Sequence, residues 1–223
     1  MQEKRRFNTV IFDMDGTLLD TLEDIADSVN YTLEKLGFPP RDLSEIRSSI
    51  GNGVTSLMEL SIPEGRQNPE FNHAISLFRQ HYSCNCTSKT RPYTGIVELL
   101  RVLANRGYKT AVISNKFDEA VKKLNDFYFS RYIAVVIGEK DDIRKKPAAD
   151  MLLSALNRLG STAEKAVYIG DSEVDIETAR NAGIDCISVT WGFRDRDWLV
   201  NHGAATIVDS PEELLRWLQG SSS

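Results

Sequence analysis

The sequence has few cysteines, no long apolar run and no surplus of basic residues. Its three cysteines, Cys84, Cys86 and Cys186, are odd in number and lack the spacing of a zinc finger, which argues against a disulfide framework or a metal finger. No stretch approaches the roughly 18 unbroken apolar residues that a membrane span needs. The polar N-terminal residues contain no apolar stretch long enough for secretion. We therefore expect a cytoplasmic protein with no membrane partner.

The charge balance excludes one further class of partner. The 223 residues include 32 acidic and 27 basic side chains, for a formal net charge of -5. A nucleic-acid-binding protein needs a basic face for the phosphate backbone, so we expect no nucleic acid partner. Any phosphate that binds this chain must be held locally, by a few well-placed groups.

Short runs of β-branched and apolar residues recur along the chain and end at small or polar residues. These runs occupy residues 9–12, 110–113, 133–137, 166–169 and 186–189. Amphipathic helical patterns separate the later runs, and Gly107, Gly160 and Gly183 follow helical segments where a left-handed cap is expected. Continuous apolar strands that alternate with helices indicate a parallel sheet covered on both faces. The fold class predicted is a doubly wound α/β domain.

Residues 18–88 break this alternation with several helical patterns and no convincing strand. An apolar stripe over residues 22–36 predicts one helix, Asp42 and Glu45 have the spacing of a helix cap, and Pro69 marks the start of a further helix. We predict an all-helical insert over 18–88 and a core domain made of 1–17 and 89–223. The alternative is a set of extra helices packed on the sheet.

Polar side chains follow the predicted strands at the edge where parallel sheets bind ligands. They are Asp13, Asp15, Ser114, Asn115, Lys146, Asp171 and Asp175. Carboxylates that converge on one point resist ionisation unless a cation lies between them, and Mg²⁺ is the hard cation that also bridges to phosphate. We expect Asp13 and Asp171 to bind Mg²⁺ through their side chains and Asp15 through its main-chain carbonyl.

The first polar cluster has the residues for phosphoryl transfer. With its charge screened by the metal, Asp13 can attack phosphorus, and Asp15 can protonate the leaving alcohol and later activate water. Gly16 permits a tight turn and close approach of the backbone, Thr17 can donate a hydrogen bond, and we expect both to bind the phosphate.

The later polar residues supply the phosphate-binding groups. Ser114, with Asn115 beside it, offers a hydroxyl donor to a phosphoryl oxygen, and Lys146 offers a positive charge. Lys145 is the competing candidate for that charge. Pro147 favours Lys146, because a proline restricts the backbone of the residue before it.

Together these segments resemble the four ordered motifs of the haloacid dehalogenase superfamily. They are 13–17 (Asp-Met-Asp-Gly-Thr), 114–115 (Ser-Asn), 146–147 (Lys-Pro) and 170–175 (Gly-Asp-Ser-Glu-Val-Asp). The chain looks most like the phosphoglycolate phosphatase branch of that superfamily, and its helical insert resembles the small cap domain. The resemblance implies that Asp13 is the nucleophile, Asp15 the acid and base, and Asp171 a magnesium ligand. Asp175 would then orient the metal shell.

Four details bear on the resemblance. The family often has a second proline after the lysine motif, where this chain has Ala148 and Ala149. The loop of Gly51 and Asn52 resembles the cap loop that faces the active site, and it is equally an ordinary helix-helix turn. Trp191 either packs near the site or belongs to the core. Asp15 argues against carbon-halogen cleavage, because the dehalogenases of the superfamily lack this aspartate.

The predicted function is a magnesium-dependent phosphatase that forms an aspartyl-phosphate on Asp13. Its substrate is a small phosphorylated metabolite, with 2-phosphoglycolate as the leading candidate. The alternatives are a phosphomutase or a pyrophosphatase of the same fold, and a phosphate-binding regulator without turnover. A pure binder has no need of Asp15 beside the nucleophile, which disfavours the regulator. We expect a monomer or a homodimer.

Overall fold

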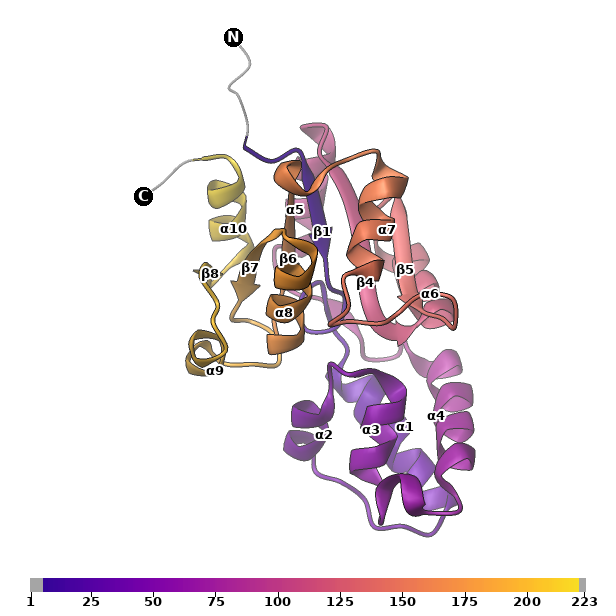
Figure 1. The fold of residues 1–223 in the computed structure, drawn as a ribbon. Coiled ribbons are helices and arrows are strands. Elements are labelled where there is room, and N and C mark those ends of the chain that lie inside the picture. The colour runs from indigo at the N-terminus through magenta and orange to yellow at the C-terminus, as the bar shows by residue number, and fades with distance from the viewer. Residues whose placement is uncertain (1–5, 221–223) are drawn as a thin grey trace.

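The computed structural model describes residues 6–220, and its centre is a six-stranded parallel sheet (Figure 1). The strands lie side by side in the order β5-β4-β1-β6-β7-β8. Their bounds are β1 Thr9–Phe12, β4 Lys109–Phe117, β5 Val135–Glu139, β6 Ala166–Gly170, β7 Asp185–Val189 and β8 Ile207–Val208. In the register of the sheet, Phe12 lies opposite Val112 on one side and Ile169 on the other. The strands that precede the acidic motifs are therefore immediate neighbours.

Helices cover both faces of this sheet. Side chains that alternate along β1 explain why: Val10 and Phe12 belong to one buried cluster and Ile11 to another. The first cluster includes residues of α5 Ile96–Asn105, α6 Asp118–Tyr128 and α10 Pro211–Leu218, and the second includes residues of α7 Asp150–Leu159 and α8 Glu173–Ala182. A short α9, Arg196–Asn201, lies before β8. The predicted doubly wound α/β fold is confirmed.

Four helices gather beyond the carboxyl ends of the strands (Figure 1). They are α1 Leu22–Lys35, α2 Leu43–Ser49, α3 Gly53–Ser61 and α4 Phe71–Asn85. A two-stranded antiparallel ribbon of β2, Leu19–Asp20, and β3, Arg91–Pro92, joins them to the sheet. We call this group of helices, residues 21–90, the cap. The predicted domain division at 17/18 and 88/89 falls beside the ribbon and stays a prediction.

Local boundaries differ from those predicted. β4 continues past residue 113 to Phe117, with an irregular register against β5, and β5 runs through Gly138 to Glu139. Helix α4 begins at Phe71 rather than at Pro69, which lies in a turn. Neither α3 nor β8 has a counterpart among the predicted elements, because β8 is two residues long and α3 starts at a glycine. The capping box of Asp42 and Glu45 is confirmed.

Two short 3-10 helices, Gly65–Gln67 and Ala163–Lys165, complete the secondary structure. Between residues 6 and 220 no helix combines the length and the apolar character that a bilayer crossing requires.

Candidate active site

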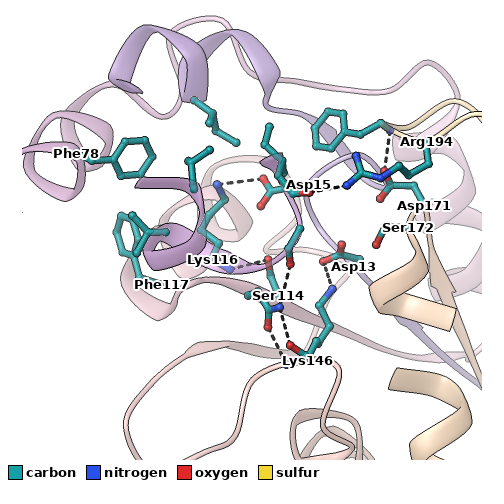
Figure 2. Close-up of a pocket in the computed structure, with 18 residues that line it drawn as sticks. Asp13, Asp15, Phe78, Ser114, Lys116, Phe117, Lys146, Asp171, Ser172 and Arg194 are labelled. Carbon is teal, nitrogen blue, oxygen red and sulfur yellow. Dashed lines mark hydrogen bonds and ion pairs between the residues drawn. The ribbon is translucent and has the colours of Figure 1, made fainter. Parts of the chain in front are cut away.

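Asp13 lies directly after β1, at the edge of the sheet that faces the cap (Figure 2). Its main-chain N–H donates to the carbonyl of Ile169 on β6, at 2.9 Å, which fixes the start of the loop. One carboxylate oxygen, Oδ1, accepts a hydrogen bond from the N–H of Met14 at 2.7 Å and lies 2.9 Å from the Lys146 ammonium. The side chain is 9 % exposed. Asp13 is therefore oriented by its own loop and by one buried cation.

Lys146 is the centre of a buried ionic network. Its Nζ lies 2.9 Å from Asp13 and 2.7 Å from Asp175 Oδ1, and it donates to the Tyr168 hydroxyl at 3.1 Å. Burial alone would lower the pKa of Lys146, but the carboxylates of Asp13 and Asp175 outweigh it and raise that pKa above its ordinary value. Lys146 therefore stays charged next to the nucleophile.

Lys145 has a different location. Its Nζ donates to the main-chain carbonyl of Asn52 in the cap at 3.0 Å and lies 3.6 Å from Glu139. The structure thus places Lys146, and not Lys145, against Asp13.

Asp171 follows β6 and is held by donors from two other segments. The hydroxyl of Thr17 donates to Asp171 Oδ1 at 3.0 Å, and the N–H of Phe193 donates to Oδ2 at 2.7 Å. Two glycines make room for this carboxylate. A Cβ at Gly16, whose φ is +80°, would lie 2.2 Å from Asp171 Oδ2, and one at Gly192 would lie 2.4 Å from Asp171 Cβ. The glycine of the first motif is therefore required for both turn geometry and space.

Three buried carboxylates form the acidic cluster of the described chain. Asp13, Asp171 and Asp175 each offer one oxygen, and these oxygens lie within 4.8 Å of one another. Burial raises the pKa of Asp13 well above its ordinary value despite Lys146, and burial together with the charge of Asp175 raises that of Asp171 to about 7. The single charge of Lys146 does not balance three carboxylates, and a divalent cation is the group that suits their oxygen donors.

Within the cluster, Asp175 is already occupied by protein donors. Its Oδ1 contacts Lys146 and the Tyr168 hydroxyl, and its Oδ2 accepts from the N–H of Ser172 at 3.2 Å and from the Ser172 hydroxyl at 2.7 Å. A carboxylate with this many partners fits an orienting role better than direct ligation.

Asp15 points toward the cap side of the same loop. Its Oδ1 accepts from the Thr21 hydroxyl at 2.7 Å and lies 3.1 Å from the ammonium of Lys116. Lys116 donates in turn to the Tyr82 hydroxyl of α4 at 2.8 Å. Sequence reasoning missed Lys116 because it ended the strand at residue 113. In a strand that continues, Ser114 and Lys116 share one face, and this period of two could have found the lysine.

Asn115 positions its neighbours. Its Oδ1 accepts from the N–H of Lys146 at 2.8 Å, and its Nδ2 donates to the carbonyls of Lys146 and of Gly51, each at 3.0 Å. Ser114 is buried at the cavity, where its hydroxyl accepts from the N–H of Lys116 at 3.2 Å. Ser114 therefore faces the cavity, while the Asn115 amide joins the Lys146 loop to the cap.

The cap loop reaches the site with its backbone. Gly51 and Gly53 line the cavity, whereas Asn52 is exposed and its carbonyl accepts a hydrogen bond from Lys145 of the core. Trp191 is half-buried, and its indole N–H donates to the carbonyl of Thr17 at 3.0 Å. Trp191 thus stabilises the loop of residues 13–17 through this hydrogen bond.

A cavity lies between this polar floor and the cap (Figure 2). Its floor carries the polar residues described above. Its remaining wall is mainly apolar and is formed by Ile25, Ile50, Val54, Leu57, Phe78 and Phe117. Arg194 closes one side, where its guanidinium donates to the main-chain carbonyls of Arg47, Ser48 and Ile50 of the cap.

Known proteins are similar to this chain in sequence and in fold. The family model of haloacid dehalogenase-like hydrolases matches residues 10–189. A phosphoglycolate phosphatase of Aquifex aeolicus is 35% identical over 82% of this chain and 85% of its own length. An N-acetylmuramic acid 6-phosphate phosphatase of Pseudomonas aeruginosa is 31% identical over 96% and 95% of the two chains.

A solved structure agrees with these matches. The crystal structure of a phosphoglycolate phosphatase candidate from Lactobacillus delbrueckii subsp. bulgaricus superimposes with a TM-score of 0.90 at 38% identity, covering 96% of this chain and 98% of that one. The predicted superfamily is thereby confirmed. The chain belongs to the haloacid dehalogenase-like hydrolases and is similar to the phosphoglycolate phosphatases among them.

Proposed function

We propose that this protein is a magnesium-dependent phosphatase that transfers the phosphoryl group of a small phosphomonoester to Asp13 and then to water. The observation that carries the proposal is the contact of Asp13 with Lys146 at 2.9 Å, within the acidic cluster and at the floor of the cavity beneath the cap. The similarity to curated phosphatases supports a phosphoric monoester hydrolase. The name of the Aquifex aeolicus relative makes 2-phosphoglycolate the leading substrate candidate.

The acidic cluster fits a magnesium site. Asp13 and Asp171 would hold the ion with their side chains and Asp15 with its main-chain carbonyl, while Asp175 orients its surroundings. When bound, Mg²⁺ screens the carboxylates and stabilises charge on the transferring phosphoryl oxygens. Burial and the neighbouring carboxylates raise the pKa values of Asp13 and Asp171, and the positive charge of a bound cation would offset both causes.

The protein groups divide the reaction between them. A carboxylate oxygen of Asp13 forms a bond to phosphorus as the ester oxygen leaves, and Asp15 gives its proton to that oxygen. Asp15 then takes a proton from water, which attacks the phosphorus of the aspartyl-phosphate and restores Asp13. Lys146 stays charged throughout and offsets the negative charge on the phosphoryl group, and Ser114 donates its hydroxyl to one phosphoryl oxygen.

Competing functions use the same first step. A phosphomutase returns the phosphoryl group to an isomer of the substrate, and a pyrophosphatase has phosphate as its leaving group. A regulator without turnover would not need Asp15 next to the nucleophile. The two-domain division, the cytoplasmic location and the monomeric or homodimeric state stay predictions from the sequence.

One assay distinguishes these functions. Purified protein is incubated with 2-phosphoglycolate, glucose 1-phosphate and pyrophosphate, each with Mg²⁺ and with chelator, and both phosphate and sugar isomers are measured. We expect phosphate release from 2-phosphoglycolate that chelator abolishes. Accumulation of glucose 6-phosphate would indicate a mutase, and the absence of any turnover would favour the regulator.

The nucleophile is tested in the same assay. Asp13→Asn is expected to lower kcat by at least about 10,000-fold, because the group that forms the covalent bond is lost. Asp197→Asn, on the exposed face of α9, is the matched control and should leave kcat unchanged. Full activity of Asp13→Asn would refute the aspartyl-phosphate.

A further inference from the structure

Three cations line the cavity, and two of them are committed to other partners. They are Lys116, Lys146 and Arg194. The ammonium of Lys146 is neutralised by Asp13 and Asp175, at the position of the transferring phosphoryl group. The guanidinium of Arg194 binds Glu173 and three main-chain carbonyls of the cap. Neither is free to bind the part of the substrate that leaves.

Lys116 is placed to contact that leaving part. Its side chain is 7 % exposed, and in Figure 2 it reaches toward Asp15 with the ring of Phe78 on its other side. The structure shows two polar partners for the ammonium, Asp15 at 3.1 Å and the Tyr82 hydroxyl at 2.8 Å. An ammonium has three N–H donors, so one more acceptor can be bound without breaking either contact.

The apolar cap wall makes a cation necessary for a charged leaving group. Ile25, Leu57 and Phe78 present only hydrocarbon to the cavity. A carboxylate buried against such a surface loses its hydration, and this cost is recovered only by pairing with a charge or with hydrogen-bond donors. Lys116 is the one cavity-lining cation within 6–220 that offers this pairing on the cap side of Asp15.

We propose that Lys116 determines substrate specificity by binding a carboxylate on the leaving group of the substrate. The substrate class is then a phosphorylated hydroxy acid rather than a neutral phosphoester. The proposal rests on the proposed phosphatase function and adds a residue and a chemical group to it.

The geometry limits where this carboxylate can be. As general acid, Asp15 contacts the ester oxygen at about 3 Å, and its Oδ1 is 3.1 Å from Lys116 Nζ. The ester oxygen therefore lies within about 8 Å of the ammonium, which is the sum of two hydrogen-bond lengths and the separation of about 2 Å between the two carboxylate oxygens. A carboxylate that also hydrogen-bonds Lys116 must be only a few bonds from the ester oxygen. The carbon next to the ester carbon satisfies this limit.

The same contact could serve a second phosphate, as in pyrophosphate. A phosphate leaving group carries more negative charge than a carboxylate, and Lys116 offers a single positive charge that it already shares with Asp15. In an otherwise apolar wall the excess charge would be unpaired, which is costly. The observations therefore favour the carboxylate.

The test compares two substrates that differ in this one group. We measure kcat/KM for 2-phosphoglycolate and for 2-hydroxyethyl phosphate, whose leaving group is neutral, with pyrophosphate as a third arm. Wild-type protein should prefer 2-phosphoglycolate to 2-hydroxyethyl phosphate by at least 10-fold. Lys116→Met should reduce that preference by about 10-fold or more, the effect of losing one charge-assisted hydrogen bond. Lys116→Arg should retain part of it.

A control variant removes a lysine from the same cap-core boundary but outside the cavity. Lys123 is exposed and donates to the carbonyl of Ser83 in the cap, so Lys123→Met should leave the preference unchanged. An equal loss on both substrates in Lys116→Met would overturn the proposal, because Lys116 would then act only through Asp15.

Two results with wild-type protein alone would also overturn it. One is equal turnover of 2-phosphoglycolate and 2-hydroxyethyl phosphate, and the other is a preference for pyrophosphate over both. These outcomes do not depend on the folding of any variant. Absence of magnesium-dependent phosphate release from every substrate would instead refute the proposed function itself.

Discussion

The floor of the cavity carries Asp13, Lys146 and Asp171, and its roof is the part of the cap at residues 47–52. Different kinds of contact hold the two in place. On the floor, side chains contact one another: Lys146 contacts Asp13 and Asp175, and the Thr17 hydroxyl donates to Asp171. At the roof, core side chains contact the backbone of the cap. Arg194, Asn115 and Lys145 donate to the carbonyls of residues 47, 48, 50, 51 and 52.

This difference in contacts lets the floor determine the reaction and the cap determine which substrate is admitted. A contact between two side chains fixes both residue types, so the floor cannot change without loss of the reaction. A contact to a main-chain carbonyl fixes the path of the chain and leaves the side chain free. Residues 48–52 of the cap can therefore stay docked over the floor while their side chains vary, and the substrate that they admit can vary with them. The side chains of Arg47 and Tyr82, by contrast, are themselves contacts between cap and core.

The largest effect is expected on the floor. Asp15→Asn should lower kcat by about 100- to 10,000-fold with little change in KM, because it removes the proton donor and leaves the binding groups in place. Steady-state kinetics on 2-phosphoglycolate would measure both constants. Unaltered kcat would remove Asp15 from the mechanism. It would also show that side chains of the floor can be substituted as freely as those of the roof.

A second floor variant separates metal binding from folding. Asp171→Asn removes one of three mutually repelling buried carboxylates, so the metal-free variant should melt no lower than metal-free wild type. Mg²⁺ should raise the Tm of wild type by several degrees and that of the variant not at all, since a ligand stabilises only the protein that binds it. Thermal melts with Mg²⁺ and with chelator provide the measurement. An equal Mg²⁺ shift in both proteins would place the ion elsewhere.

A smaller effect is expected where the roof is anchored. Arg194→Met removes the contacts to three cap carbonyls and should raise KM about 10-fold, the magnitude of one lost charge-assisted hydrogen bond, with a lesser change in kcat. The control is Arg196→Met, two residues after Arg194. It removes an exposed ion pair with Asp209 and should change neither kcat nor KM. A loss of kcat comparable to that of Asp15→Asn would show that the roof takes part in the chemistry.

The smallest effect is expected from a side chain of the roof itself. Ser48 gives its carbonyl to Arg194, while its exposed side chain contacts only its own helix, at the carbonyl of Glu45. Ser48→Ala should therefore change kcat/KM less than about 2-fold and the free energy of unfolding by less than about 0.5 kcal/mol. A large effect would contradict the view that the cap is docked through its backbone.

The floor could be predicted from the sequence because its residues follow strands of continuous apolar character. In a parallel sheet all such positions share one edge, so Asp13 and Asp171 converge without knowledge of the strand order. Lys146 lies in the loop between β5 and α7, and it was favoured because Pro147 follows it. The resemblance to a known family then supplied the roles that convergence alone does not assign.

The roof could not be predicted in the same way. Contacts such as that of Arg194 with the cap carbonyls depend on how the helices sit over the sheet, and no sequence period records that. Lys116 was missed for a simpler reason: the irregular end of β4 hides a strand that continues to Phe117. Tyr168, whose hydroxyl contacts Lys146 and Asp175, was assigned only to a buried strand, because its polar tip gives no signal in an apolar run.

The position of β1 has a consequence for how the molecule is made. The strand spans residues 9–12, yet its two neighbours in the sheet are residues 109–112 and 166–169. During synthesis the first strand leaves the ribosome long before either partner exists, with both of its apolar faces uncovered. Such long-range pairing slows folding and exposes the chain to aggregation. The N–H of Asp13 donates to a carbonyl of β6, so Asp13 is held in place only once β6 has paired with β1. An N-terminal fragment that lacks β6 therefore cannot assemble the floor of the site.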